Sequence, residues 1–335
     1  MEQLSVSFII PVFNRPIEVD ELLQSFLGLE GDHDYEIVIV EDGSTHTAQN
    51  NVYKYKDRLN ISYLYKSNSG PGDSRNYGMK NAKGNYFIIL DSDVLLPPHY
   101  LITVLSYLNQ DFVDCFGGPD AAHPSFSSLQ KAINFVMTSF ITTGGIRGHK
   151  KQIDEFQPRS FNMGLSREVF KQSKGFGNIH PGEDPDLSLR LKKLEFKTAL
   201  IPEAFVYHKR RISWSKFYTQ VHKFGMVRPI LNQWHPESSK IMFWLPSLFI
   251  IGFIASLILL TMNIVWPMYI YALYFIVVFI SALMSTRSIL VSIQSIIAIG
   301  IQLLGYGLGF LKSFIAIRIF GKDPKTHFPQ LFFNG

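Results

Sequence analysis

The sequence predicts an α/β protein in which a doubly wound sheet is followed by an α-helical membrane domain. Up to about residue 236, short apolar runs alternate with segments of helical periodicity, which is typical of a largely parallel sheet. From residue 241 to about residue 319, charged side chains nearly disappear, which indicates helices in contact with lipid. We therefore expect two domains, residues 1–236 and residues 241–319, within the 335 residues of the chain.

The cysteine content and the first residues indicate the cellular compartment of the protein. The single cysteine, Cys115, excludes a disulfide within the chain and fits a reducing compartment. We expect its thiol to be a small buried side chain rather than a nucleophile. No basic stretch precedes the first apolar run, so we expect no secretory signal.

The elements of the first domain follow in a regular order. Four short apolar runs, each bounded by turn-forming residues, predict buried strands. They cover residues 6–11, 36–40, 61–65 and 85–90. Residues between these runs predict helices at 17–27, 47–58 and 70–82. The carboxyl ends of parallel strands share one edge of the sheet, where open α/β sheets bind their ligands.

Two carboxylates, Asp91 and Asp93, directly follow the fourth strand, and Pro97 and Pro98 prevent further strand pairing. Unpaired carboxylates in such a place are costly unless a positive charge neutralises them. A divalent cation shared with a diphosphate fits, because Mg²⁺ and Mn²⁺ prefer carboxylates together with phosphate oxygens. In isolation, an Asp-x-Asp tripeptide such as residues 91–93 is more often a polar turn. The neighbouring motifs favour a metal site here.

Other polar and aromatic residues fall at the same edge. Pro11, Phe13 and Asp42 lie at the ends of the first two strands, and an aromatic face with a carboxylate suits a nucleoside. Core packing is the alternative for Phe13. Arg75 lies on the helix that begins near Gly70, whose N-terminus favours anions, so it is placed either to contact a phosphate or as an ordinary surface arginine.

Six segments carry a resemblance to a known family. In chain order they read IIPVFNR, EDGS, SGPGDSRNYGMKNAKGNYFIILDSD, FNMGLSREVF, GEDPDLSLRL and IPEAFVYH. Together they resemble glycosyltransferase family 2, the inverting nucleotide-sugar enzymes of GT-A fold, over about residues 5–230. The resemblance implies a mixed, doubly wound GT-A sheet, a UDP-, GDP- or dTDP-sugar as donor, and Mn²⁺ or Mg²⁺ as cofactor.

The resemblance also implies roles for the residues that match the family's motifs. It implies that Asp93 is the main metal ligand, with Asp91 near the ribose or a metal-bound water and His208 as a further ligand. Imidazole is an acceptable ligand for Mn²⁺ but less so for Mg²⁺. A structural role is the alternative for His208. The positions implied for the donor nucleotide are Pro11, Phe13, Asn14, Asp42, Arg75 and Asp91.

The candidate base lies further along the chain. Glu183 and Asp184 precede an amphipathic helix and so lie in its first turn, where negative charge is stabilised. Inverting transfer needs a carboxylate that takes the proton of the acceptor hydroxyl, across the sugar from the diphosphate. The resemblance implies Asp184 as this catalytic base, with Glu183 as the less favoured candidate and plain helix capping as the alternative.

The long apolar runs of the second domain predict membrane segments. Residues 241–262 and 266–284 are each near the roughly 20 residues that span hydrocarbon, and Trp244 and Trp266 lie near their ends. Their short uncharged linker predicts that the two spans form a hairpin. We expect the first domain to lie on the cytoplasmic side. Residues 289–311 are also long enough to span, but a third span would place the following basic residues outside. We predict two spans and a third membrane-embedded segment, which either spans the membrane, packs against other helices or lies at the interface.

Two amphipathic segments accompany these spans. Residues 211–234 mix basic and aromatic side chains, which suits an interfacial helix on an anionic leaflet. Such mixtures also bind nucleic acid, but the adjacent apolar segments favour the bilayer, so we expect no nucleic-acid partner. Residues 126–137 have helical apolar spacing, and a basic loop follows at 142–148. A helix on the bilayer surface with a mobile lid is one interpretation, and a buried amphipathic helix is the other.

These expectations describe a membrane-anchored inverting glycosyltransferase of cell-envelope polysaccharide assembly, with its catalytic domain at the cytoplasmic face of a bacterial inner membrane. The expected acceptor is polyprenyl-linked or otherwise close to the membrane, and a homo-oligomer is left open. One alternative is a processive polysaccharide synthase, although residues 220–224 lack the Q-x-x-R-W motif of those enzymes. A non-catalytic membrane sensor of sugar nucleotides and a nucleotidyltransferase are the others.

Overall fold

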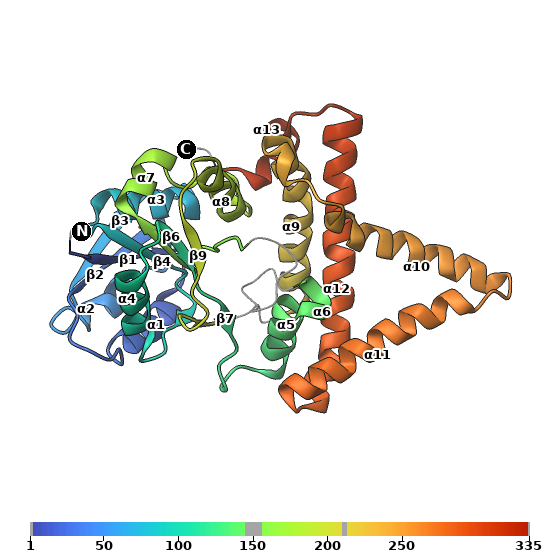
Figure 1. The fold of residues 1–335 in the computed structure, drawn as a ribbon, viewed down its shortest axis with the longest axis horizontal. Coiled ribbons are helices and arrows are strands. Elements are labelled where there is room, and N and C mark those ends of the chain that lie inside the picture. Colours follow the sequence, from blue (N-terminus) through green and yellow to red (C-terminus); the bar gives the residue numbers. More distant parts are fainter. Residues whose placement is uncertain (1–2, 145–155, 210–212, 334–335) are drawn as a thin grey trace. The chain divides into compact units, whose positions relative to one another are not determined.

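A computed structural model describes residues 3–144, 156–209 and 213–333 (Figure 1). The described chain divides into two compact units. The sheet unit consists of residues 3–123, 156–209 and 332–333. The helical unit consists of residues 124–144 and 213–331.

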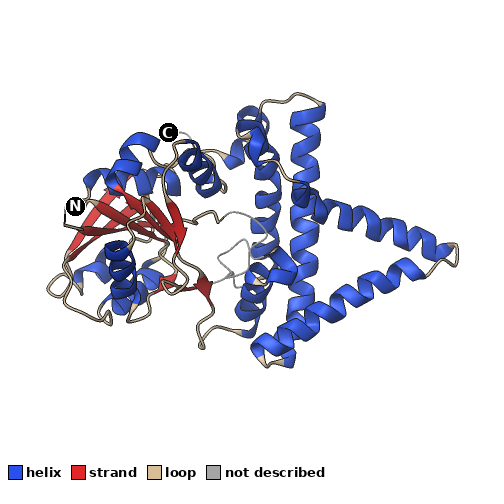
Figure 2. Cartoon of the chain, in the orientation of Figure 1, coloured by secondary structure: helices blue, strands red, loops and turns tan. Residues whose placement is uncertain are grey.

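A mixed sheet forms the centre of the sheet unit (Figure 2). It has seven strands in the order β3-β2-β1-β4-β8-β6-β9. Strands β3, β2, β1 and β4 are parallel, β8 is antiparallel to both β4 and β6, and β6 is parallel to β9. The strands are β1 (Val6–Val12), β2 (Tyr35–Asp42), β3 (Ile61–Lys66), β4 (Tyr86–Leu90), β6 (Cys115–Gly117), β8 (Asn162–Ser166) and β9 (Thr198–Leu200). The prediction of an α/β fold with a mixed sheet is confirmed.

Helices cover both faces of this sheet, because alternate residues of each strand point to opposite faces. On β1, Phe8 and Ile10 pack into one apolar cluster with α1 and α4, whereas Ile9 packs into another with α3, α7 and α8. Pro16 occupies the first position of α1, where its missing N–H costs no hydrogen bond. The helices of this unit are α1 (Pro16–Phe26), α2 (Gln49–Tyr53), α3 (Pro71–Asn81), α4 (Tyr100–Gln110), α7 (Arg167–Ser173) and α8 (Glu183–Lys193).

A second, three-stranded sheet lies beyond the carboxyl end of β4. It contains β5 (Val94–Leu95), β10 (Val206–His208) and β7 (Asp120–Ala121) in the order β5-β10-β7. Strand β10 runs antiparallel to β5, with His208 opposite Val94, and parallel to β7. This pairing brings a residue from late in the chain to the aspartates that follow β4.

The helical unit contains three helical segments that are long and apolar enough to cross a membrane, Ile241–Thr261, Trp266–Thr286 and Ile289–Ile319. In Figure 1, α10 and α11 extend from α12 and meet at their connecting turn. The helices are α5 (Ser128–Thr138), α6 (Phe140–Thr143), α9 (Trp214–Trp234), α10 (Leu245–Thr261), α11 (Trp266–Thr286), α12 (Ile289–Phe314) and α13 (Pro324–His327). Shorter helical turns are η1 (Pro236–Ser238), η2 (Ile241–Trp244), η3 (Ile315–Ile319) and η4 (Pro329–Leu331).

Small residues let α9 and α12 approach closely. A Cβ atom on Gly225 would lie 2.1 Å from the carbonyl oxygen of Tyr306, and one on Gly309 would lie 2.2 Å from that of His222. Phe217 and Val221, part of the apolar stripe of α9, are buried in a cluster with α5, α11 and α12. That stripe therefore packs on protein, and the interfacial position of residues 211–234 stays a prediction for the rest of the helix.

Helix α5 corresponds to the amphipathic helix predicted at residues 126–137. Ser127 and Gln130 form a capping box at its start. Ile133 and Val136 are fully buried in the same cluster as Phe217, so the buried interpretation of this helix is correct. The predicted lid at residues 142–148 falls largely outside the described residues.

Candidate functional site

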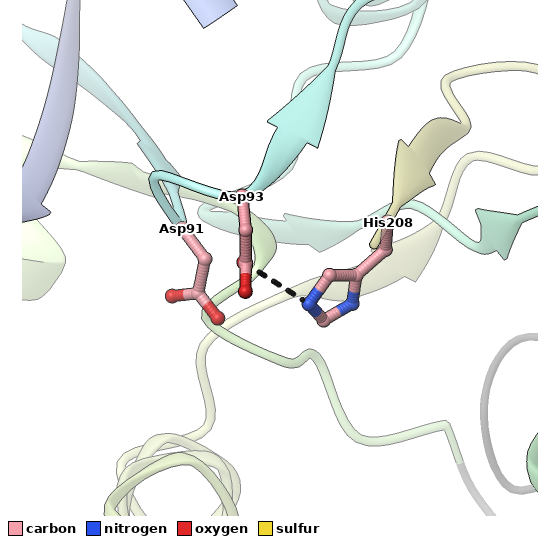
Figure 3. A group of neighbouring side chains, drawn as sticks. All are labelled: Asp91, Asp93 and His208. Carbon is pink, nitrogen blue, oxygen red and sulfur yellow. Dashed lines mark ion pairs between the residues drawn. The ribbon is translucent and has the colours of Figure 1, made fainter. Parts of the chain in front are cut away.

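Asp91, Asp93 and His208 come together beyond the carboxyl end of β4 (Figure 3). One ligand atom from each residue lies within 4.8 Å of the others. The pairing of β5 with β10 sets this geometry, and His208 Nε2 lies 3.3 Å from Asp93 Oδ1. Two carboxylates and one imidazole are a donor set that suits Mn²⁺, so the chemistry of these residues fits the metal that the sequence predicts.

Two residues that sequence reasoning missed hold the other side of the imidazole. Asp120 on β7 has a fully buried side chain, and its Oδ2 lies 3.6 Å from His208 Nδ1. The ring of Phe161 stacks on His208 with centroids 5.0 Å apart. The buried Asp120 carboxylate and the stacked Phe161 ring flank the imidazole and favour the ring orientation in which Nε2 faces Asp93.

A basic residue, Arg15, also contacts Asp93. It follows the predicted nucleotide-binding residues Phe13 and Asn14, and its Nη1 lies 2.9 Å from Asp93 Oδ2. Sequence reasoning missed this contact, although the motif IIPVFNR already contained the arginine. A cation therefore stands beside the candidate metal ligands, at a position where a diphosphate would need one.

Arg75 is not a surface residue, so that alternative is wrong. The residue is only 3% exposed. Its Nη2 donates to Asp91 Oδ1 at 2.8 Å, and its Nη1 donates to Glu183 Oε1 at 3.1 Å. The arginine thus joins Asp91 to Glu183 at the start of α8, 92 residues later in the chain.

The two carboxylates of the acidic pair lie in different environments. Burial alone would raise the pKa of the Glu183 carboxyl, but His180, 2.9 Å away, and Arg75 hold that pKa well below its usual range. Burial and the neighbouring Glu183 carboxylate raise the pKa of Asp184, and the Arg75 charge offsets part of this rise. Asp184 Oδ1 is buried and has no hydrogen-bond partner among the residues that the structure describes.

This difference separates the two carboxylates chemically. Glu183 is committed to ion pairs, whereas Asp184 keeps an oxygen available and has a raised proton affinity. Both properties suit a general base, since a base works best when its pKa lies near the working pH.

The residues predicted for the nucleoside lie at the ends of β1 and β2. Phe13 is 51% exposed, so core packing is wrong for this side chain and its ring is accessible. Asn14 adopts a φ of +54°, a region that asparagine tolerates. Its Oδ1 accepts hydrogen bonds from the backbone N–H groups of Thr45 and His46, each at 2.9 Å, and so ties the two loops together.

Asp42 and Pro11 are placed differently from Phe13. Pro11 lies within β1, opposite Val40 of β2. Asp42 is buried, and its carboxylate accepts hydrogen bonds from Lys66 Nζ at 2.6 Å and from the backbone N–H groups of Ser69 and Gly70, each at 2.9 Å. The carboxylate therefore holds the segment that leads into α3.

Comparisons with known proteins agree with this architecture. The family model described as Glycosyl transferase family 2 matches residues 7–173. The chain is 35% identical over 111 residues to an uncharacterized glycosyltransferase of Rickettsia felis, covering 33% of this chain and 18% of that protein. It is 35% identical over 108 residues to validoxylamine A glucosyltransferase of Streptomyces hygroscopicus subsp. limoneus, covering 30% of this chain and 23% of that protein.

A third curated relative is the poly(ribitol-phosphate) β-N-acetylglucosaminyltransferase TarS of Staphylococcus aureus. It is 30% identical over 114 residues, which cover 33% of this chain and 20% of that protein. The matches thus span less than a quarter of the length of each of these three relatives.

Among solved structures, a mannosyltransferase from Pyrobaculum calidifontis in complex with GDP-Man and Mn²⁺ is similar to this chain. The TM-score is 0.55 at 13% identity, over 96% of this chain and 89% of that one. At this identity the likeness concerns the fold, and it confirms a GT-A-like sheet followed by long helices.

Proposed function

Because the chain belongs to glycosyl transferase family 2, we propose that it transfers a sugar from a nucleotide-sugar donor, with inversion at the anomeric carbon, to an acceptor at a membrane. One observation carries this proposal. Arg75 makes ion pairs with both Asp91 and Glu183, so the candidate metal ligands and the candidate base belong to one site.

The donor end of the site has a place for each part of a nucleotide sugar. The accessible ring of Phe13 and the loops tied by Asn14 would hold the base, and Arg15 would face the diphosphate. Asp91, Asp93 and His208 would hold Mn²⁺ or Mg²⁺, which neutralises the charge of a diphosphate leaving group when it is bound. The GDP-Man and Mn²⁺ bound by the Pyrobaculum mannosyltransferase, and the names of the relatives, support this assignment.

Asp184 would act as the base. Its Oδ1 would accept the proton of the acceptor hydroxyl. The hydroxyl oxygen would at the same time attack the anomeric carbon from the side opposite the diphosphate. Glu183 would remain ionised and paired, which holds the first turn of α8 and raises the proton affinity of Asp184. Arg75 would keep this turn at a fixed position relative to Asp91.

The acceptor is proposed to be lipid-linked, for example a polyprenyl-linked sugar. The three long apolar segments support this, because an enzyme held in a bilayer meets an amphiphilic substrate there. We propose that residues 241–319 anchor the protein in a bacterial inner membrane, with residues 1–236 on the cytoplasmic side. The orientation agrees with basic residues such as Arg287 next to the spans.

Release of free nucleoside diphosphate tests the proposal. Detergent-solubilised protein is incubated with Mn²⁺ and a panel of UDP-, GDP- and dTDP-sugars, with and without a polyprenyl-linked acceptor. We expect one donor to be consumed, and we expect Asp184→Asn to slow its use by about 10²- to 10⁴-fold while nucleotide binding persists.

The matched control is Asp186→Asn, two residues further along the same helix, which should retain far more activity. Binding of a sugar nucleotide without turnover by the unmodified protein would instead favour a sensor. Release of pyrophosphate would favour a nucleotidyltransferase, and either result would overturn the proposal.

A further inference from the structure

Residues 332 and 333 follow the helical unit in sequence but belong to the sheet unit. Phe332 forms an antiparallel bridge with Ile179. The backbone N–H of Phe333 donates to the carbonyl oxygen of Asn178 at 3.0 Å, and Asn178 Nδ2 donates back to the carbonyl oxygen of Phe333 at 3.3 Å. Figure 1 shows this end of the chain beside α8. We call residues 332–333 the strap.

The ring of Phe333 lies on two parts of the candidate site. A Cβ atom on Gly70 would lie only 2.3 Å from Phe333 Cδ2, so the ring packs directly on the residue that precedes α3. Gly70 has a φ of +94°, and its N–H is held by Asp42. The ring also lies 6.0 Å, centroid to centroid, from the imidazole of His180.

Contacts run from His180 into the proposed reaction site. His180 Nδ1 lies 2.9 Å from Glu183 Oε1, and the same oxygen accepts the hydrogen bond from Arg75. Arg75 in turn holds Asp91. The strap therefore contacts residues 178–180. The same segment leads into Glu183, the first residue of α8, which lies next to the candidate base Asp184.

We propose that Phe333 is a positioning residue, and that the strap holds residues 178–183 so that Glu183 stays paired with Arg75 and Asp184 stays aimed at the acceptor. This inference rests on the proposed function for the role of Asp184. The strap touches the start of α3 and the loop before α8, but Phe13 and Asn14 lie on other loops. Loss of the strap should therefore impair the reaction step more than nucleotide binding.

Phe333→Ala in the full chain tests the proposal. A displaced base geometry typically slows a reaction by up to about 10²-fold, so we expect kcat to fall by about 10- to 100-fold. The dissociation constant for the nucleoside diphosphate should change by less than about threefold, since uniform binding is not altered. Phe333→Tyr keeps the ring and should restore kcat.

Amide hydrogen exchange gives a readout that needs no substrate. Phe333→Ala should speed exchange in peptides covering residues 176–183, and should leave β1 and β2 unchanged. Asn178→Ala, which removes one hydrogen bond of the strap, should have a smaller effect in the same peptides and keeps the test open if Phe333→Ala does not fold. The control is Phe320→Ala, because Phe320 is 67% exposed in the helical unit.

Two results would overturn the inference. One is unchanged exchange at residues 176–183 in both strap variants, and the other is an equal loss of kcat and of nucleotide affinity that Phe333→Tyr does not restore. If the unmodified protein shows no transferase activity, the proposed function fails, and the exchange result still decides whether the strap orders this loop.

Discussion

Replacing Arg75 with methionine should destabilise the sheet unit, because it removes the buried guanidinium from the Glu183 carboxylate and leaves only the partly exposed His180 imidazole beside it. The side chains of Arg75 and Glu183 are 4% and 5% exposed and pair at 3.1 Å. Removing one partner of such a pair costs about 3–5 kcal/mol. Asp91 is 31% exposed, so the loss of its ion pair should add at most about 1 kcal/mol. Most of the effect should therefore come from Glu183.

A double-mutant cycle separates the buried charge from the lost side-chain packing. In a Glu183→Gln background there is no charge to leave uncompensated, so Arg75→Met should cost at least about 2 kcal/mol less than in the unmodified protein. All four tryptophans, Trp214, Trp234, Trp244 and Trp266, lie in the helical unit, and their fluorescence would not follow the sheet unit. Native-state amide exchange of peptides from α3 and α8 is the suitable assay. Equal costs of Arg75→Met in the two backgrounds would refute the reasoning.

Three further predictions concern other parts of the protein. Asp120→Asn should weaken Mn²⁺ binding by about 10- to 100-fold, because the proposed ligand His208 loses the carboxylate beside its Nδ1 atom. Electron paramagnetic resonance of free Mn²⁺ measures this affinity, and an unchanged value would contradict the role of Asp120. The rate should fall as the pH drops through the raised pKa of Asp184, since the proposed base must be ionised to accept a proton. Glu183→Gln removes the negative charge that raises this pKa, so the acid limb of the pH–rate profile should move to lower pH, and a shift to higher pH would count against the assignment. Gly225→Ala should destabilise the helical unit by about 1–3 kcal/mol through overpacking. Gly300→Ala, which meets no atom within 4 Å, should lack this cost, and equal melting temperatures in detergent would contradict the close packing of α9 on α12.

The first half of the sheet could be predicted because its strands are short apolar runs with clear turns between them. β1, β2 and β4 bury both faces, so their side chains are mostly apolar and the pattern stands out, whereas β3, at the edge of the sheet, is only half-buried. β6, β8 and β9 have three to five residues each, and β8 reads NMGLS, which carries no strand periodicity. Only the resemblance of the FNMG segment to a family indicated that this region matters.

The parts of the site formed by residues that directly follow a strand could be predicted. The parts formed by contacts between residues far apart in the sequence could not. Asp91 and Asp93 come directly after β4, so their place at the edge of the sheet follows from the strand. The pairing of Arg75 with Glu183 joins residues 108 positions apart and leaves no pattern in either segment. Asp120 lies on a two-residue strand whose partner is β10, so its position behind His208 depends on tertiary structure.

The helical unit shows another limit of periodicity. An apolar stripe on a helix is the same whether it faces lipid or protein, so α9 and α5 could be predicted as amphipathic but their neighbours could not. The spacing of Gly305 and Gly309 on α12 was the available signal for close packing. In the structure, those glycines lie against α9.

The hydrogen bonds of Asp42 bear on how substitutions at this position should be interpreted. The carboxylate supports Lys66, Ser69 and Gly70, and Gly70 is where α3 begins. An inactive Asp42 variant would therefore report loss of the support for the segment before α3 as readily as a missing contact to the nucleobase. Discrimination among uracil, guanine and thymine is better tested on the solvent-facing ring of Phe13, where a change alters recognition without removing a backbone anchor.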